Sequence, residues 1–412
     1  MRIQLDRDRF VETMKEQAKI GGTENGGLHR LALSDEDKKV RDWFYEQMEA
    51  AGLEIVVDEF GNMFGRREGT MSNTDPVLVG SHLDSQPYGG IYDGPLGVIS
   101  ALELVRTLND EGIETEHPIE IVNWTNEEGS RYQPAMQGSG VWTGAHDIEE
   151  EYVKTDEDGL NLEAELERIG YKGEQSAKPR TDYETYLELH IEQGPYLALE
   201  GKDVGIVTGI VGFTWGAVTY YGEADHSGPT PMHFRSDALV AAADVITQIR
   251  RIPSTLGNQT VGTTGYIDAK PNSINTIPGE VTFSWGFRDP DDEIIEEAFA
   301  RVLDEAEAAA EREGVDWEWE ERMRASSVDF ADRCIDAVEA AADDLGYDGM
   351  RIFSGAGHDA THMTEVCDTG MVFAVSEDGK SHNENEYTSW DDCYASANTI
   401  ANAALDIAEP KP

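Results

Sequence analysis

Apolar and polar positions in the first half of the chain follow the pattern of strands that lead into loops and helices. Residues 77–79 form a short apolar run, a glycine-rich loop follows, and one apolar stripe then marks a helix: Val98, Ala101, Leu102, Val105 and Leu108. Two further apolar runs, at 119–124 and 186–190, each end in a polar loop. Because open α/β sheets bind ligands beyond the carboxyl ends of their strands, we expect these three loops to face one crevice.

The pattern changes between residues 209 and 325, where the apolar segments predict a separate α+β domain. Its expected order is β-α-β-β-α-β, that of a ferredoxin-like domain, with strands at 215–221, 261–269, 281–287 and 315–319 and helices at 236–250 and 292–312. The first pattern resumes with a helix at 332–345, a strand at 371–374 and a helix at 396–407. We therefore predict an α/β protein whose larger domain has two parts, 1–208 and 326–412, with 209–325 inserted between them.

The composition adds an extreme acidic charge to this picture. The chain has 412 residues with 32 Lys and Arg against 82 Asp and Glu, a formal net charge of −50. Nucleic acid is excluded as a partner because phosphate binding needs a basic surface. The acids are spread through periodic segments, and such a surface is best tolerated in molar salt, where the Debye length is about 3 Å. We expect a salt-loving source organism; an ordinary acidic protein would fold fully without added salt.

Cysteines and apolar runs bear on the location of the protein. Cys334, Cys367 and Cys393 are odd in number and widely spaced, so no disulfide framework is expected. The N-terminal residues lack the apolar core of a signal peptide, and no run approaches the roughly 18 apolar residues of a membrane helix. We expect a cytoplasmic protein that binds no membrane.

Polar residues with metal-binding chemistry collect where the predicted strands end. His82 and Asp84 follow the first strand, and the others are Asp93, Glu127, Glu128, His190 and His382. A His-X-Asp pair can place an imidazole ligand beside a carboxylate that holds its other ring nitrogen. Such a pair alone is common on surfaces, but here it accompanies residues from three other strand ends. Carboxylate and imidazole ligands suit Zn²⁺, Mn²⁺, Co²⁺ or Ni²⁺.

The adjacent Glu127 and Glu128 favour a site with two roles. Neighbouring acids usually belong to a solvated face, but this pair lies between a buried run and Gly129. One carboxylate can bind metal while its neighbour transfers protons.

Several strings of the chain resemble the hydantoinase/carbamoylase family of amidohydrolases, in the family's order. They lie between about Gly26 and Tyr387 and include Gly80–Ser85, Gly90–Gly97, Asn126–Tyr132, Glu188–Pro195, Asp225–Met232, Pro271–Pro278 and Ser354–Ala360. The family includes N-carbamoyl-L-amino-acid hydrolases, allantoate amidohydrolases and β-ureidopropionases, and it belongs with the aminoacylase-like two-metal hydrolases. The resemblance implies an aminopeptidase-like catalytic domain, with the insertion as a lid and dimerisation domain.

The resemblance also implies two divalent metal ions per chain and roles for the polar residues. The implied ligands are His82 and His190 for one ion, Glu128 and His382 for the other, and Asp93 as the bridge. Glu127 would be the general base for the water that the cations activate, and would return the proton to the leaving nitrogen. Asp84 would assist by orienting His82. A cis peptide between Asp93 and Gly94 is implied as well.

Substrate contacts are implied in the same way. A homodimer is expected, in which His226 reaches the partner's active site and stabilises the carbonyl oxygen as it gains charge. Asn275 and Arg288 would bind the substrate carboxylate. The remaining pocket residues would be Gln193, Gly355, Ala356 and Gly357.

Each of these substrate roles has a structural alternative. His226 and Asn275 could serve turns, and Arg288 could pair with Asp289 or with the acids that follow it. His358 and Asp359 could support the site or be purely structural. Many relatives carry Gln and Arg shortly after Ile210-Val-Gly212, where this chain has Phe213-Thr-Trp215, and the usual Gly pair is lost at 376–380, which leaves side-chain specificity open.

The favoured function is hydrolysis of N-carbamoyl-L-amino acids to amino acid, CO₂ and ammonia. Allantoate amidohydrolase and β-ureidopropionase are close alternatives, and an aminoacylase or dipeptidase is a more distant one. A binding module without activity is disfavoured, because degenerate relatives should lose a ligand or the base, and all are present here.

Overall fold

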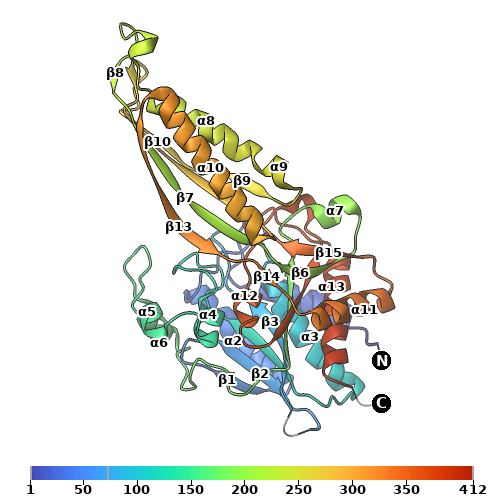
Figure 1. Ribbon diagram of the computed structural model, residues 1–412. Helices are drawn as coiled ribbons and strands as arrows, with labels where there is room; N and C mark the ends of the chain where they lie inside the picture. The colour runs from blue at the N-terminus through green and yellow to red at the C-terminus, as the bar shows by residue number, and fades with distance from the viewer. Residues whose placement is uncertain (1, 72–73, 411–412) are drawn as a thin grey trace. The chain divides into compact units, whose positions relative to one another are not determined.

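The computed structural model describes residues 2–71 and 74–410, which form two compact units (Figure 1). The first unit takes in the chain up to Thr208 and from Phe330 onward, and the second is Gly209–Asp329. The second unit was expected to end at residue 325, but it ends at Asp329. The reason is the short strand β14 (Val328–Asp329), which pairs antiparallel with Gly209 and Ile210, the first two residues of the unit.

The first unit is built on a mixed sheet with a parallel centre, which confirms the α/β prediction. The sheet order is β1 (Glu54–Val57), β2 (Met63–Arg67), β4 (Ile119–Trp124), β3 (Val77–His82), β5 (Thr185–Ile191), β16 (Asp368–Ala374) and β6 (Val204–Ile210), and β15 (Gly349–Ser354) also pairs with β6. β4, β3, β5 and β16 run parallel, and nearly all of their residues are buried. Their carboxyl ends therefore meet at one edge of the sheet, where ligands bind in such folds.

Two long and largely buried helices pack against this sheet. α3 (Pro95–Glu111) and α13 (Trp390–Ile407) contact each other and β3 and β5. α13 begins before the expected residue 396 because the Ser389 side chain caps the N–H of Asp392. The other helices are α1 (Arg7–Gln17), α2 (Asp35–Ala50), α4 (Gln137–Thr143), α5 (Ile148–Tyr152), α6 (Leu162–Ile169), α7 (Tyr196–Glu200), α11 (Asp332–Leu345) and α12 (Ala360–Met363), with a 3₁₀ turn at Glu377–Gly379.

A buried arginine ties helix α2 to the end of strand β4. Arg41 donates to Asp37 in its own helix at 2.8 Å, to the Gly61 carbonyl at 2.7 Å and to the Thr125 hydroxyl at 3.2 Å. Buried charge is costly unless it is paired, and here it is paired with a carboxylate and two polar oxygens. The loop that carries Glu127 thus starts from a fixed point.

The second unit is a five-stranded antiparallel sheet with helices on one face. Its sheet order is β10 (Ile267–Lys270), β12 (Glu280–Asp289), β7 (Gly212–Tyr221) and β13 (Asp316–Ala325), with β9 (Val261–Thr263) also paired to β12. Helices α8 (Ala238–Arg251) and α10 (Asp292–Glu313) bury their apolar stripes against alternate residues of β7 and β12. The remaining elements are β8 (Asp225–His226), β11 (Thr276–Ile277), α9 (Pro253–Leu256) and a 3₁₀ turn at Met232–Phe234.

Two expected boundaries in this unit are wrong for local reasons. The strand expected at 261–269 is broken into β9 and β10, because the backbone N–H groups of Gly265 and Tyr266 turn to the side-chain hydroxyl of Ser284. α8 starts two residues later than expected because the Asp237 carboxylate caps the N–H groups of Leu239 and Val240.

Two further features concern the whole described chain. Cys334, Cys367 and Cys393 are all free, as expected. Across residues 2–71 and 74–410, no helix is long and apolar enough to cross a bilayer.

Candidate metal centre

Five potential ligands gather at the carboxyl edge of the parallel strands. His82 is the last residue of β3, His190 lies near the end of β5, and Glu128 follows β4. Asp93 lies just before α3, and His382 lies in the loop between β16 and α13. The elements converge because parallel strands all end at the same edge, as the sequence pattern predicted for the first three loops.

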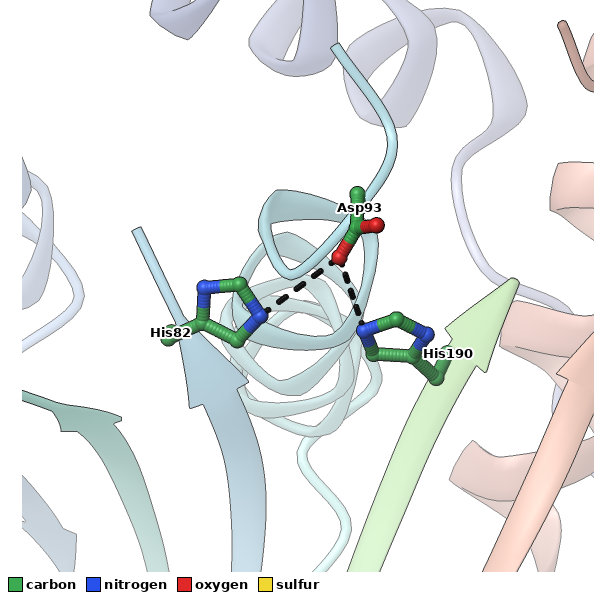
Figure 2. A group of neighbouring side chains, drawn as sticks. All are labelled: His82, Asp93 and His190. Carbon is green, nitrogen blue, oxygen red and sulfur yellow. Dashed lines mark ion pairs between the residues drawn. The ribbon is translucent and has the colours of Figure 1, made fainter. Parts of the chain in front are cut away.

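The carboxylate of Asp93 is shared by two groups of ligand atoms. One group is His82, Asp93 and His190, and the other is Asp93, Glu128 and His382; within each, the ligand atoms lie within 4.8 Å of one another. Figure 2 shows Asp93 between the first two imidazoles, with its Oδ1 3.0 Å from Nε2 of His190 and 3.6 Å from Nε2 of His82. Its Oδ2 lies 3.6 Å from Nε2 of His382. One carboxylate oxygen therefore faces each group.

The two buried histidines present the correct nitrogen for binding a cation. Nδ1 of His82 lies 3.1 Å from the carbonyl oxygen of Asp84, and Nδ1 of His190 lies 3.0 Å from that of Ile191. A carbonyl oxygen only accepts, so Nδ1 carries a proton and Nε2 is the nitrogen turned toward the shared carboxylate. Nε2 of His82 is buried without a hydrogen-bond partner, and a Cβ at Gly94 would lie 2.3 Å from its ring. The donor set fits a divalent cation.

Asp84 has a different contact from the one expected. The backbone carbonyl of Asp84, rather than its carboxylate, holds the ring of His82, because the carboxylate oxygen lies 3.6 Å from Nδ1. The carboxylate instead accepts the backbone N–H groups of Glu127 and Glu128, each at 3.3 Å. Asp84 thus orients His82 through its main chain and the Glu127-Glu128 pair through its side chain.

Glu127 lies beside His82 of the first group but belongs to neither group. Its Oε2 is 3.5 Å from Nε2 of His82, and the side chain is buried. Burial raises the pKa of Glu127 well above its usual value; the His82 imidazole opposes this shift, and the carboxylates of Asp359 and Glu128 add to it. A carboxylate with a raised pKa is suited to accept a proton and return it.

Asp93 shows the opposite shift. Burial alone would raise its pKa, but His190 and His82 hold the pKa well below the usual value of an aspartate. Asp93 is therefore the anionic centre of the cluster.

Glu386 supports Asp93 and was not identified from the sequence. Its carboxylate accepts the backbone N–H groups of Tyr92 and Asp93, at 3.2 and 3.1 Å, and the hydroxyl of Ser381 at 3.2 Å. Burial and the neighbouring Asp93 raise the pKa of Glu386 to about 8. The string Asn383-Glu-Asn-Glu386 holds two glutamates, and no periodicity separates the buried Glu386 from the half-buried Glu384.

Gln193 reaches the shared carboxylate. Its side-chain amide donates to Oδ2 of Asp93 at 2.7 Å and lies 3.2 Å from the hydroxyl of Ser381. The backbone of Gln193 has a positive φ of 58°, a conformation that non-glycine residues adopt rarely.

The loop Gly355-Ala356-Gly357 lies between β15 and α12 and is linked to the centre through a histidine. Ser354 Oγ accepts the N–H of Ala356 at 3.2 Å and lies 2.9 Å from Nε2 of His358. The buried ring of His358 contacts that of His190, with centroids 4.4 Å apart. Asp359 is buried against the Ser139 hydroxyl at 2.5 Å. His358 therefore packs directly against a ligand, whereas this bond links Asp359 to helix α4.

The other three predicted site residues belong to the second unit. His226 ends β8 and pairs with Thr276 of β11, and Asn275 directly precedes β11, where its carbonyl accepts the N–H of Ser227 at 3.0 Å. Arg288 lies on β12 with its guanidinium 5.4 Å from the ring centroid of Phe213.

The expected cis peptide after Asp93 is wrong. Within the described residues, the cis bonds are Gln133–Pro134 and Lys270–Pro271, so Asp93–Gly94 is trans. The trans form is favoured by about 3 kcal/mol for a non-proline bond. The chain turns into α3 through the positive φ of Gly94.

Comparison with known proteins places this centre in a family. The chain belongs to the peptidase family M20/M25/M40, whose model matches residues 78–406. It is 41% identical to an N-carbamoyl-L-amino-acid amidohydrolase of Rhizobium meliloti over 98% of this chain and 97% of that protein. It is 34% identical to an allantoate amidohydrolase of Bacillus subtilis over 90% of each.

A solved structure agrees with these relatives. An amidase of the hydantoinase/carbamoylase family from Burkholderia multivorans superposes with a TM-score of 0.95, at 43% identity over 98% of each chain. The resemblance found in the motifs is thereby confirmed, and the protein is a hydrolase of C–N bonds.

The position of Glu127 beside His82, outside both ligand groups, generates a prediction. Glu127→Gln should keep the fold and the bound metal, since Glu127 is in neither ligand group, but lower kcat at least about 10²-fold because the amide cannot accept a proton. The neighbouring Glu128→Gln is the matched control, and it should lose one of the two metal ions, because Glu128 belongs to one ligand group. Metal content and turnover are measured on the same samples. Near-normal turnover of metal-loaded Glu127→Gln would remove Glu127 as the base.

Proposed function

We propose that this protein hydrolyses N-carbamoyl-L-amino acids to the amino acid, CO₂ and ammonia. The observation that carries the proposal is the Asp93 carboxylate shared by two ligand groups, with Glu127 beside them. The similarity to the Rhizobium meliloti amidohydrolase over nearly the whole of both chains supports this substrate class.

The metal centre would hold two divalent ions, of Zn, Mn, Co or Ni. His82 and His190 would bind one ion, Glu128 and His382 the other, and Asp93 both. Such ions supply positive charge that lowers the pKa of a shared water and polarises the ureido carbonyl. Glu127 accepts the proton of the attacking water at its carboxylate and delivers it to the departing nitrogen. Asp84 and Glu386 act through the backbone N–H groups that they hold.

The second unit would supply substrate contacts. Arg288 and Asn275 bind the α-carboxylate, and His226 of one chain donates a hydrogen bond to the carbonyl oxygen in the partner's site. Gln193 and the loop Gly355-Ala356-Gly357 complete the pocket. In this scheme the unit is a ferredoxin-like lid and dimerisation domain, and its sheet order β10-β12-β7-β13 supports that interpretation.

Exposed apolar residues near His226 support a homodimer. Met232, Phe234 and Ile274 are large, strongly exposed, and close in sequence to His226 and Asn275. A monomer rarely exposes such a group, so a second copy of the chain is its proposed cover.

The substrate class can be tested by ammonia release in molar salt. Metal-loaded protein should release ammonia from N-carbamoyl-L-amino acids with a kcat/KM at least about tenfold above that for allantoate or β-ureidopropionate. N-acyl amino acids, which release no ammonia, are assayed for free amino acid. Allantoate is the alternative to weigh most closely, since a Bacillus subtilis relative carries that activity in its name. Hydrolysis of N-acyl amino acids alone would overturn the proposal.

The role of His226 across the dimer predicts complementation between two inactive proteins. Glu127→Ala and His226→Ala homodimers should each be nearly inactive, since one lacks the base and the other the oxyanion donor. A mixed dimer joins an intact Glu127 from one chain to an intact His226 from the other at one of its two sites. With random exchange about half of the dimers are mixed, so activity should recover to about a quarter of wild type.

Differential affinity tags verify the mixed dimers, and dissociation and reassembly by changing the salt concentration supply the exchange. Two Glu127→Ala preparations with different tags, exchanged in the same way, are the control and should stay inactive. Verified mixed dimers without activity would show that His226 serves its own chain or takes no part in catalysis.

A further inference from the structure

One face of the second unit's sheet carries Arg288 among apolar side chains. Trp285 and Phe287 of β12 are buried on the face that α8 and α10 cover, so the alternating Arg288 is on the opposite face. Arg288 lies in register with Phe213 of β7 and with Val261 of β9. Residues paired across strands share a face, so these side chains are neighbours.

Phe213 and Trp215 form an aromatic platform beside the guanidinium. Their ring centroids lie 5.1 Å apart, and Cζ of Arg288 lies 5.4 Å from the centroid of Phe213. Trp215 stays 41% exposed. Gly286 is the residue opposite Trp215 on β12, so that strand places no side chain over the indole. Met323 of β13, on the other side of Trp215, is also exposed.

This arrangement places a binding group for a carboxylate beside an apolar surface. A guanidinium matches a carboxylate in charge and in hydrogen-bonding geometry, while an exposed indole offers a broad apolar surface that favours another aromatic ring. A ligand with a carboxylate and a planar apolar group a few bonds away can use both at once. An amino acid derivative with an aromatic side chain has this construction, because its side chain starts from the carbon that bears the carboxylate.

We propose that Trp215, packed against Phe213, contacts the substrate side chain and gives the enzyme a preference for N-carbamoyl amino acids with an aromatic side chain. The inference rests on the proposed function, since it takes Arg288 as the site of the substrate carboxylate. With the carboxylate on Arg288, the aromatic substituent stacks on the indole and excludes water from it. A substrate without a side chain gains nothing from the platform.

The test compares two substrates, N-carbamoyl-L-tryptophan and N-carbamoylglycine, on the wild-type protein and three variants. The ratio of kcat/KM for the two substrates removes effects common to both. Trp215→Ala should lower this ratio at least about tenfold, mainly through a higher KM for the tryptophan derivative, and Trp215→Phe should retain most of it. Tyr221→Ala is the matched control, since Tyr221 is 40% exposed on the same face of the same strand and should leave the ratio within about twofold.

The outcomes separate this inference from the proposal on which it rests. Wild-type protein that cleaves neither derivative, nor any other N-carbamoyl amino acid, would defeat the proposed function itself. Wild-type protein that cleaves both equally well, or a ratio unchanged in Trp215→Ala, would overturn the aromatic preference and leave the reaction intact. Equal losses on both substrates in Trp215→Ala would also overturn it, because they would show a general structural role.

Discussion

The burial of negative charge around Asp93 is the constraint on which the rest of the structure depends. A single region at the carboxyl ends of the strands, together with the middle of β5, buries the side chains of Asp84, Asp93, Glu127, Glu128, Glu188, Asp359 and Glu386. Desolvation raises the pKa of each except Asp93, whose imidazole neighbours hold its pKa down. Such a cluster keeps its charges only where cations compensate them. Two divalent ions bound as proposed, one at each ligand group, would meet that requirement and at the same time supply the chemistry of the reactive site.

Backbone N–H groups and residues with positive φ angles hold these carboxylates and the predicted ligands in position. Backbone N–H groups satisfy Asp84, Glu188 and Glu386, so their carboxylates stay fixed without further cations. Asn126, Gln193 and His382 all have positive φ angles, between 53° and 58°. Non-glycine residues hold that conformation only when the surroundings enforce it, and here all three lie in the loops that form the centre. The unfavourable backbone conformation of these three residues thus costs some stability and positions the loops that carry the predicted metal ligands.

The sequence was most informative where a pattern has a single physical cause. Uninterrupted apolar runs identified the parallel strands, and polar residues at their ends identified His82, Asp93, Glu127, Glu128 and His190. Short half-exposed strands such as β1 and β15 were missed, because they carry no clear period over so few residues. The ends of α8 and α13 were misplaced where a single capping side chain decides the first turn.

Contacts between residues far apart in the chain could not be predicted from the sequence. At Asp84 the backbone carbonyl, rather than the expected carboxylate, contacts His82, and the carboxylate accepts the backbone N–H groups of Glu127 and Glu128. This arrangement depends on how the ends of β3 and β4 meet. Glu386 supports Asp93 from a loop 293 positions later along the chain. The ligand pairing itself came from the family resemblance, since spacing alone does not say which histidine shares an ion with which carboxylate.

The most direct test of this account is the metal stoichiometry of the protein and of single ligand variants. Metal-free protein in molar salt is titrated with Zn²⁺ or Mn²⁺, and bound metal is counted per chain. The account predicts two ions for the wild type, one for Glu128→Gln, and loss or severe weakening of both for Asp93→Asn, with the thermal unfolding of each variant confirming a folded state. One ion per chain in the wild type, or two tightly bound ions in folded Asp93→Asn, would contradict it.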